Sequence, residues 1–73
     1  MNSIRLEYTL LGHEFIPLND LLKRLHLVGT GGEANQRISA GEVRVNGLVE
    51  TQKRKKLRSG DAVVFQAITI TIR

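Results

Sequence analysis

The amino-acid sequence predicts an α+β fold, in which two N-terminal helices pack on a small, mainly antiparallel sheet. Leucines recur at helical spacing within residues 17–27. Apolar and polar residues alternate within residues 4–11, 42–47 and 68–72, as they do in strands that bury one face. The chain has 73 residues, enough for one small domain that spans residues 1–73.

The period of the apolar residues distinguishes the first strand from the first helix. Ile4, Leu6 and Tyr8 share one face of an extended segment, which predicts a half-buried strand. In residues 17–27 the spacing changes to that of a helix with one apolar stripe, formed by Leu18, Leu21, Leu22 and Leu25. Pro17 is suited to the first turn of this helix.

A second helix is predicted over residues 31–40. Thr30 is a favourable N-cap, and Glu33 stands three residues later, which completes a capping-box pattern. Gly41 is suited to the left-handed position that ends many helices. Gly31 and Gly32 also leave the backbone amides at the helix start open to a phosphate oxygen. A structural cap alone would explain the same GTGG sequence, so both interpretations stay open.

The remaining strands follow the second helix. Residues 42–47 alternate, and they end in Asn46-Gly47, the preferred pair for a type I′ hairpin turn. Residues 48–50 would then begin a return strand. Two further strands are predicted at residues 62–65 and 68–72. The coarse order of elements is β-α-α-β-β-β, in which residues 42–47 and their short return strand count as one hairpin.

The positive charge of the chain is concentrated in ETQKRKKLRSGD, residues 50–61. The net charge is +4, and this stretch holds five of the eleven basic residues: Lys53, Arg54, Lys55, Lys56 and Arg58. Without them, six basic residues face seven acidic ones, a net charge of −1. A field localised in this way attracts polyanions. Because predicted strands bracket the stretch and Leu57 can anchor it in the core, we expect a structured ridge and not a flexible tail.

The composition argues against several classes of function. The chain has no cysteine, which excludes disulfides and thiolate metal sites. His13 and His26 are the candidates for acid–base chemistry, and no nucleophile stands at a suitable spacing from them. We therefore expect no enzyme activity, no metal, no cofactor and no small-molecule substrate. No apolar run approaches the roughly 18 residues of a membrane span and no signal peptide is evident, so a cytoplasmic protein is expected.

Most of the chain carries a family pattern. The run LNDLLKRLHLVGTGGEANQRISAGEVRVNG, followed by KKLRSGDAVVF, joins a leucine-rich helix, a short break, a glycine-terminated helix, V-x-V-N-G and a later G-D. The residues that carry this order are Leu18, Asp20, Leu21, Leu22, Thr30, Ala34, Ile38, Gly41, Val43, Val45, Asn46, Gly47, Gly60 and Asp61. In order and spacing they resemble the ribosomal protein S-four type RNA-binding domain, the alpha-L motif. The resemblance covers residues 17–66, and small stand-alone bacterial members are the most similar subgroup.

The resemblance implies a non-catalytic module that contacts structured RNA, ribosomal RNA in particular. We expect the chain to be a monomer. The contacts would come from the basic stretch, the start of the second helix and exposed charges nearby. The predicted RNA-binding residues are Lys23, Arg24, Thr30, Gly31, Gly32, Arg37, Arg44, Lys53, Arg54, Lys55, Lys56 and Arg58. Many family members have arginine at the positions of Gly31 and Asn35, so the second helix offers less charge here.

Three alternatives to a specific RNA contact stay open. The basic stretch could be an ordinary solvated loop. It could also dock an acidic protein partner, which would make the chain an adaptor, or it could bind DNA without specificity. Phe15, Phe65 and Tyr8 are the only aromatic residues, which argues against binding through a row of stacked bases.

Overall fold

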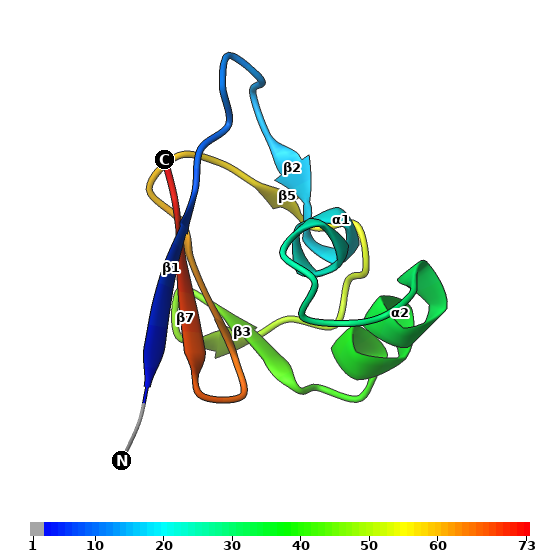
Figure 1. Cartoon of the computed structure of the whole chain (residues 1–73). Helices are drawn as coiled ribbons and strands as arrows, with labels where there is room; N and C mark the ends of the chain where they lie inside the picture. Colours follow the sequence, from blue (N-terminus) through cyan, green and yellow to red (C-terminus); the bar gives the residue numbers. More distant parts are fainter. Residues whose placement is uncertain (1–2) are drawn as a thin grey trace.

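The structure, a computed structural model, describes residues 3–73 (Figure 1). Its elements in chain order are β1 (Ile4–Tyr8), β2 (Ile16–Pro17), α1 (Leu18–Arg24), α2 (Gly31–Ser39), β3 (Val43–Val45), β4 (Leu48–Val49), β5 (Lys56–Leu57), β6 (Ala62–Phe65) and β7 (Ile68–Ile72). The α+β class and both helices are confirmed. The description of the helices as N-terminal is imprecise, because β1 comes before them.

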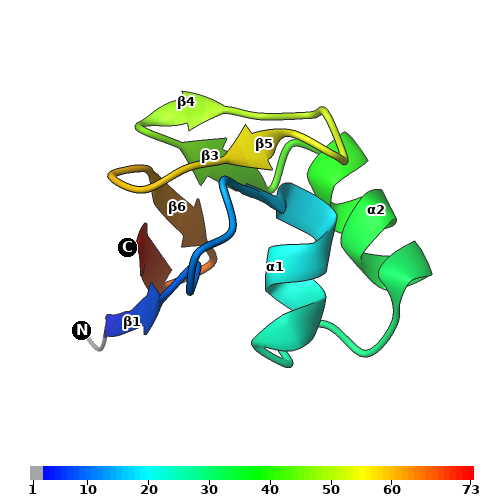
Figure 2. The same ribbon diagram turned by 90° about the horizontal axis from the view of Figure 1, so that it is seen from above.

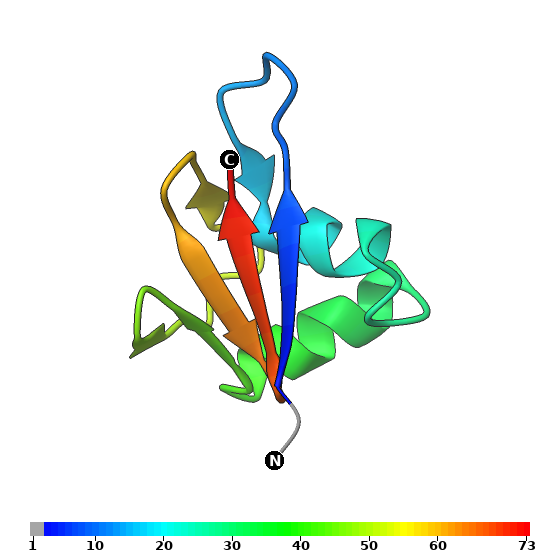
Figure 3. The same cartoon turned by 60° about the vertical axis from the view of Figure 1, so that its left-hand side comes forward.

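Five strands form the larger sheet, in the order β1-β7-β6-β3-β4. The pairs β7–β6, β6–β3 and β3–β4 are antiparallel, so the sheet is mainly antiparallel, as predicted. β1 instead pairs in parallel with β7, with Leu6 opposite Ile70 (Figure 3). The backbone amide of Arg73 donates to the carbonyl oxygen of Tyr8 at 2.8 Å just beyond this pair. The first and last strands of the domain therefore lie side by side.

β2 and β5 form a second, two-stranded sheet that joins the basic stretch to the start of α1. Ile16 pairs with Leu57, and Pro17 pairs with Lys56, in antiparallel register. Ile16 and Leu57 are both buried. Two residues are too few to show a period in a sequence, which explains why alternation did not reveal either strand.

The two helices begin and end close to their predicted positions. Thr30 Oγ1 accepts a hydrogen bond from the backbone amide of Glu33 at 3.1 Å, as the capping pattern predicts for α2. Gly41 follows α2 with a φ of +80°, the left-handed position expected of it. α1 ends three residues earlier than predicted. It stops there because His26 has a φ of +58°, which an α-helix does not contain.

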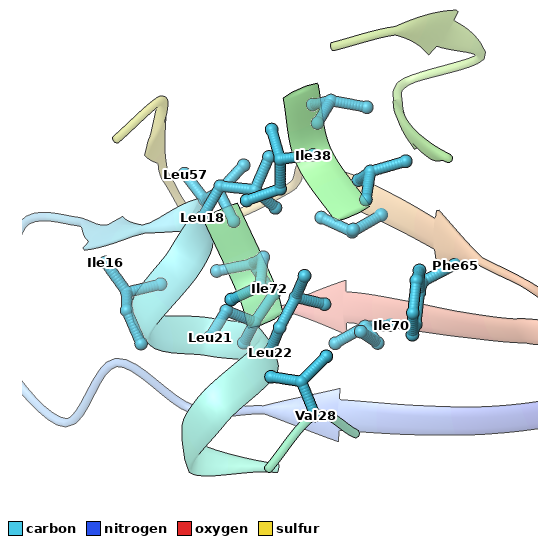
Figure 4. Close-up of a cluster of buried hydrophobic side chains, with 14 of the residues drawn as sticks. Ile16, Leu18, Leu21, Leu22, Val28, Ile38, Leu57, Phe65, Ile70 and Ile72 are labelled. Atoms are coloured by element: carbon cyan, nitrogen blue, oxygen red, sulfur yellow. The ribbon is translucent and has the colours of Figure 1, made fainter. Parts of the chain in front are cut away.

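Both helices pack on one face of the larger sheet and close over one apolar core (Figures 2 and 4). The helical leucine stripe predicted this burial: Leu18, Leu21 and Leu22 are fully buried. From the sheet, Phe65, Ile70 and Ile72 face them. In the described part of the chain no helix covers the opposite face of the sheet (Figure 3). The domain thus has a helical side and an open sheet side.

The turn between β3 and β4 has the predicted type I′ geometry, with φ values of +52° at Asn46 and +86° at Gly47. The side chain of Asn46 has a second role. Its Nδ2 donates to Asp61 Oδ1 at 3.0 Å, and its Oδ1 accepts from the backbone amide of Ala62 at 2.9 Å. These bonds tie the hairpin to the turn that follows the basic stretch.

Candidate nucleic-acid interface

The basic ridge is our name for five side chains: Lys53, Arg54, Lys55, Lys56 and Arg58. The backbone of this segment caps a helix. The carbonyl oxygens of Lys53 and Lys55 accept hydrogen bonds from the backbone amides of Asn19 and Leu18, each at 2.9 Å. The first amides of a helix have no partner within it, and Pro17 at the N-cap position offers no side-chain cap. The backbone that carries the ridge is therefore fixed through main-chain atoms, and the five side chains remain free for other contacts.

Leu57 anchors the ridge in the core. Its side chain is fully buried, and Figure 4 shows it beside Leu18 of α1. Side chains alternate along a strand, so Lys56 and Arg58 point away from the core on either side of this anchor. The predicted anchoring role of Leu57 is confirmed, and the stretch is not a flexible tail.

Phe15 is the residue of this surface that sequence reasoning missed. The ammonium nitrogen of Lys56 lies 4.9 Å from the centre of its ring, and the guanidinium carbon of Arg58 lies 5.7 Å from it. Both distances are in the range of cation–π attraction. Phe15 directly precedes β2, and β2 pairs with β5, so the contact would have been foreseeable only from the pairing of these two short strands.

The charges of the ridge are not neutralised by carboxylates. Within residues 3–73, none of the five ridge side chains forms an ion pair, whereas Arg37 forms two. Arg37 lies 3.0 Å from Glu42 and 3.6 Å from Glu33, and the hydrogen bond to Glu42 is the main cause of its raised pKa. The charge of Arg37 is thus largely occupied by protein partners, while that of the ridge is available to a ligand.

Two asparagines join the middle of α2 to the backbone of the ridge. Asn19, whose amide bonds the ridge backbone, donates from Nδ2 to Asn35 Oδ1 at 3.2 Å. Gly31 lies one helical turn before Asn35, a rise of about 6 Å. Thr30, Gly31 and Gly32 therefore lie further from the ridge than Asn35 does. They begin α2 just after the end of α1, whereas the ridge caps the start of α1 (Figure 2). Arg37, two residues beyond Asn35, projects from the opposite side of the helix, where it meets Glu33 and Glu42.

The remaining predicted residues divide between the two sides of the domain. Lys23 and Arg24 are exposed on α1, on the helical side. Arg44 lies between buried Val43 and Val45 on β3, so its side chain points to the open face of the sheet. Lys23 and Arg24 thus lie on the helix whose start the ridge backbone caps, whereas Arg44 lies on the other side of the domain.

Asp61 supports the end of the ridge. Its Oδ2 accepts from the backbone amide of Arg58 at 2.8 Å, and its Oδ1 accepts from Asn46. These two hydrogen bonds, the one from Arg58 first, lower the pKa of Asp61 below its usual value, and nearby Lys55 adds to the effect. The carboxylate is a structural acceptor, and its position fixes the backbone from which Arg58 projects.

The described residues offer no cluster of metal ligands and no membrane-spanning helix. Among residues 3–73, no group of three or more histidine, cysteine, aspartate or glutamate side chains is placed to hold a metal ion. None of the helices in that range is long and apolar enough to cross a membrane.

Comparison with known proteins gives a consistent result. Residues 9–73 match the S4 domain family, which is the family of the S-four type domain. The Escherichia coli K12 protein named "Putative RNA-binding protein YbcJ" is 37% identical over 60 residues, which are 82% of this chain and 86% of that protein. The Shigella flexneri protein named "Uncharacterized protein YbcJ" matches with the same identity and coverage.

A solved structure also resembles this fold. The solution structure of YbcJ from E. coli is described as revealing an alfaL motif involved in RNA-binding. It superimposes with a TM-score of 0.66 at 32% sequence identity, and the match covers 99% of this chain and 89% of that one. The likeness therefore extends over the whole described domain, including the β1–β7 pair that lies outside residues 17–66.

Proposed function

This chain belongs to the S4 domain family, and from that premise we propose that it is a non-catalytic module that binds structured RNA. The basic ridge would contact the phosphate backbone, and the start of α2 would add backbone amides. Lys23 and Arg24 would extend the surface along α1. Arg37 and Arg44 would make smaller contributions, since one is paired with carboxylates and the other lies on the open face of the sheet.

The observation that carries this proposal is the fixed, unpaired charge of the ridge. Its backbone caps α1 at 2.9 Å, and its side chains have no carboxylate partner within the described residues. A backbone that is already ordered loses little conformational entropy on binding, which favours a polyanion of matching shape. Folded RNA offers phosphates at fixed spacing, and proteins read it mainly through shape and backbone contacts. We therefore propose ribosomal RNA, in the cytoplasm, as the ligand class.

Charge reversal at matched positions tests this proposal. Arg54 and Arg5 are both exposed, but Arg54 lies on the ridge and Arg5 lies on β1, facing the open side of the sheet. Arg54→Glu should weaken binding to a ribosomal RNA hairpin about 5- to 10-fold, because a phosphate contact becomes a repulsion. Arg5→Glu changes the net charge equally and should have little effect. Equal losses from the two variants would indicate unspecific attraction, and no loss from Arg54→Glu would refute the proposed surface.

A further inference from the structure

A groove lies beside the ridge, between the β1–β2 loop and α1. It has a volume of about 220 Å³ and is lined by, among others, Tyr8, His13, Phe15, Asp20 and Arg24. Sites for drug-sized ligands typically measure about 300–1,000 Å³, so this groove suits a smaller group of one or two rings. Two of its ten lining residues, Tyr8 and Phe15, are aromatic, a high share for a chain with 4% phenylalanine, tyrosine and tryptophan, and His13 adds a third ring.

The loop that forms one wall of the groove is held in a fixed and unfavourable conformation. The amide of Leu10 donates to the carbonyl oxygen of Arg73 at 2.9 Å, and the amide of His13 donates to that of Leu10 at 3.1 Å. Leu11 and Gly12 between them have φ values of +53° and +89°. Left-handed backbone is rare for leucine, and Leu11 is also 84% exposed at the edge of the groove. The two residues form a type I′ turn, whose first left-handed position leucine adopts less readily than asparagine or glycine.

Asp20 gives the groove its polarity. The residue is half-buried, and within residues 3–73 its carboxylate neither accepts a hydrogen bond nor forms an ion pair. Arg24, one turn along α1, lines the same groove. A carboxylate repels a phosphate group, so it selects a ligand that presents N–H donors.

Phe15 connects the groove to the ridge. It lines the groove, and its ring lies beneath Lys56 and Arg58. A nucleotide whose phosphate rests on these two cations would therefore place its base next to the groove. The two sites share one side chain, which makes them neighbours on one continuous surface.

We propose that this groove receives one unpaired guanine base of the bound RNA, an inference that rests on the proposed function. Tyr8, His13 and Phe15 offer ring surfaces for the base. Asp20 accepts hydrogen bonds from the base edge. Sequence-specific recognition of RNA commonly uses single bases that leave the stack, pack against aromatic rings and hydrogen-bond through their edges.

Of the four bases, guanine best matches the Asp20 carboxylate as a single acceptor group. Its N1–H and N2 amino group point in the same direction, so both can donate to one carboxylate in a bidentate contact. Adenine and cytosine each offer one amino group beside a ring nitrogen acceptor, and that acceptor would face the carboxylate unfavourably. Uracil offers one N–H between two carbonyl oxygens. The chemistry of Asp20 therefore ranks guanine first.

A set of five RNA hairpins tests the proposal. They share one stem and carry a single bulged nucleotide that is guanine, adenine, cytosine, uracil or abasic. The full chain should bind the guanine hairpin at least about fivefold more tightly than the others, the lower end of what one bidentate base contact provides. Asp20→Ala should abolish this preference while affinity for the abasic hairpin stays the same or rises.

Glu14→Ala is the matched control, because Glu14 is an exposed carboxylate of the same loop that does not line the groove. It should keep the guanine preference. His13→Ala is a second variant that removes a ring from an exposed loop position, where folding does not depend on it, and it should reduce the preference. Circular dichroism checks that each variant is folded.

The outcomes separate the two proposals. Equal binding of all five hairpins, a preference for another base, or a guanine preference that survives Asp20→Ala would overturn the groove assignment. In each of these cases the proposed function stands if Arg54→Glu still weakens the binding of every hairpin. Failure of all five hairpins to bind, or indifference of all five to Arg54→Glu, would overturn the proposed function and this inference with it.

Discussion

The ammonium group of Lys56 lies 4.9 Å from the ring centre of Phe15, so an aromatic side chain organises the most basic part of this protein. The guanidinium of Arg58 shares the same ring at 5.7 Å. The two cations are two residues apart on one side of β5, where they would otherwise repel each other. The ring offsets that repulsion and holds both near one position.

Replacement of Phe15 by leucine tests this arrangement. Each cation–π contact at an exposed site contributes about 0.5–1 kcal/mol, so Phe15→Leu should weaken RNA binding about 2- to 5-fold. All five ridge charges remain, so the dependence of binding on salt concentration should not change. Binding titrations at three salt concentrations measure both quantities. Unchanged affinity would show that the ring does not position the cations.

The hydrogen bonds of Asn46 predict a graded loss of stability. Asn46→Gly keeps the backbone at a φ of +52° without strain but removes the bonds to Asp61 and Ala62, which should cost about 1–2 kcal/mol. Asn46→Ala removes the same bonds and adds left-handed strain of about 1 kcal/mol. Urea denaturation should therefore rank wild type, glycine and alanine in that order. Equal stabilities of wild type and Asn46→Gly would show that the side-chain bonds contribute nothing.

The lowered pKa of Asp61 predicts an acid-dependent loss of stability. Because the folded state lowers the pKa, the ionised form stabilises the fold. This stabilisation is complete above the unfolded value of about 3.9 and is lost as the pH falls through the lower folded value. Asp61→Asn should be less stable than wild type at pH 7, and the difference should shrink as the pH falls below about 4. A constant difference over that range would contradict the assignment.

A substitution that should strengthen RNA binding tests whether the start of α2 belongs to the interface. Gly31 stands where many family members have arginine, and a Cβ atom built there meets no other atom within 4 Å. Gly31→Arg should therefore fold normally and tighten RNA binding about fivefold. The slope of log K against log salt concentration should also become steeper by the amount expected for nearly one more phosphate contact. Gly31→Ala is the control and should change neither. If Gly31→Arg also leaves the affinity unchanged, the start of α2 lies outside the interface.

Much of the fold could be predicted because its signals are local. The leucine stripe of α1, the Thr30 cap, the Asn46-Gly47 turn and the alternation of β7 each depend on residues close together in sequence. The pairing of strands is not local, because it joins segments that are far apart in the sequence. Alternation in β1 indicates a strand, but nothing in that pattern says that it joins β7 in parallel at the opposite end of the chain.

The charge of the candidate site could be predicted from the sequence, but the contacts that hold the site in place could not. The concentration of basic residues and the buried Leu57 could be inferred from composition and pattern. The cap on α1 could not be inferred, because it uses the backbone carbonyl oxygens of Lys53 and Lys55. Every residue has a backbone carbonyl, so residue types do not indicate which carbonyl caps a helix. The same limit hid Phe15, whose partners depend on the pairing of two-residue strands.

The most direct test of the central claim is the salt dependence of RNA binding with and without the ridge charges. Five phosphate contacts predict a slope of log K against log salt concentration of about −3.5 for single-stranded RNA and about −4.5 if the RNA behaves as a duplex. Conversion of Lys53, Arg54, Lys55 and Lys56 to glutamine leaves the backbone cap of α1 in place. The slope of this folded variant should become less steep by about 2.8 for single-stranded RNA, or by about 3.6 for a duplex, because four contacts are lost. An unchanged slope would place the RNA elsewhere on the protein and contradict the account.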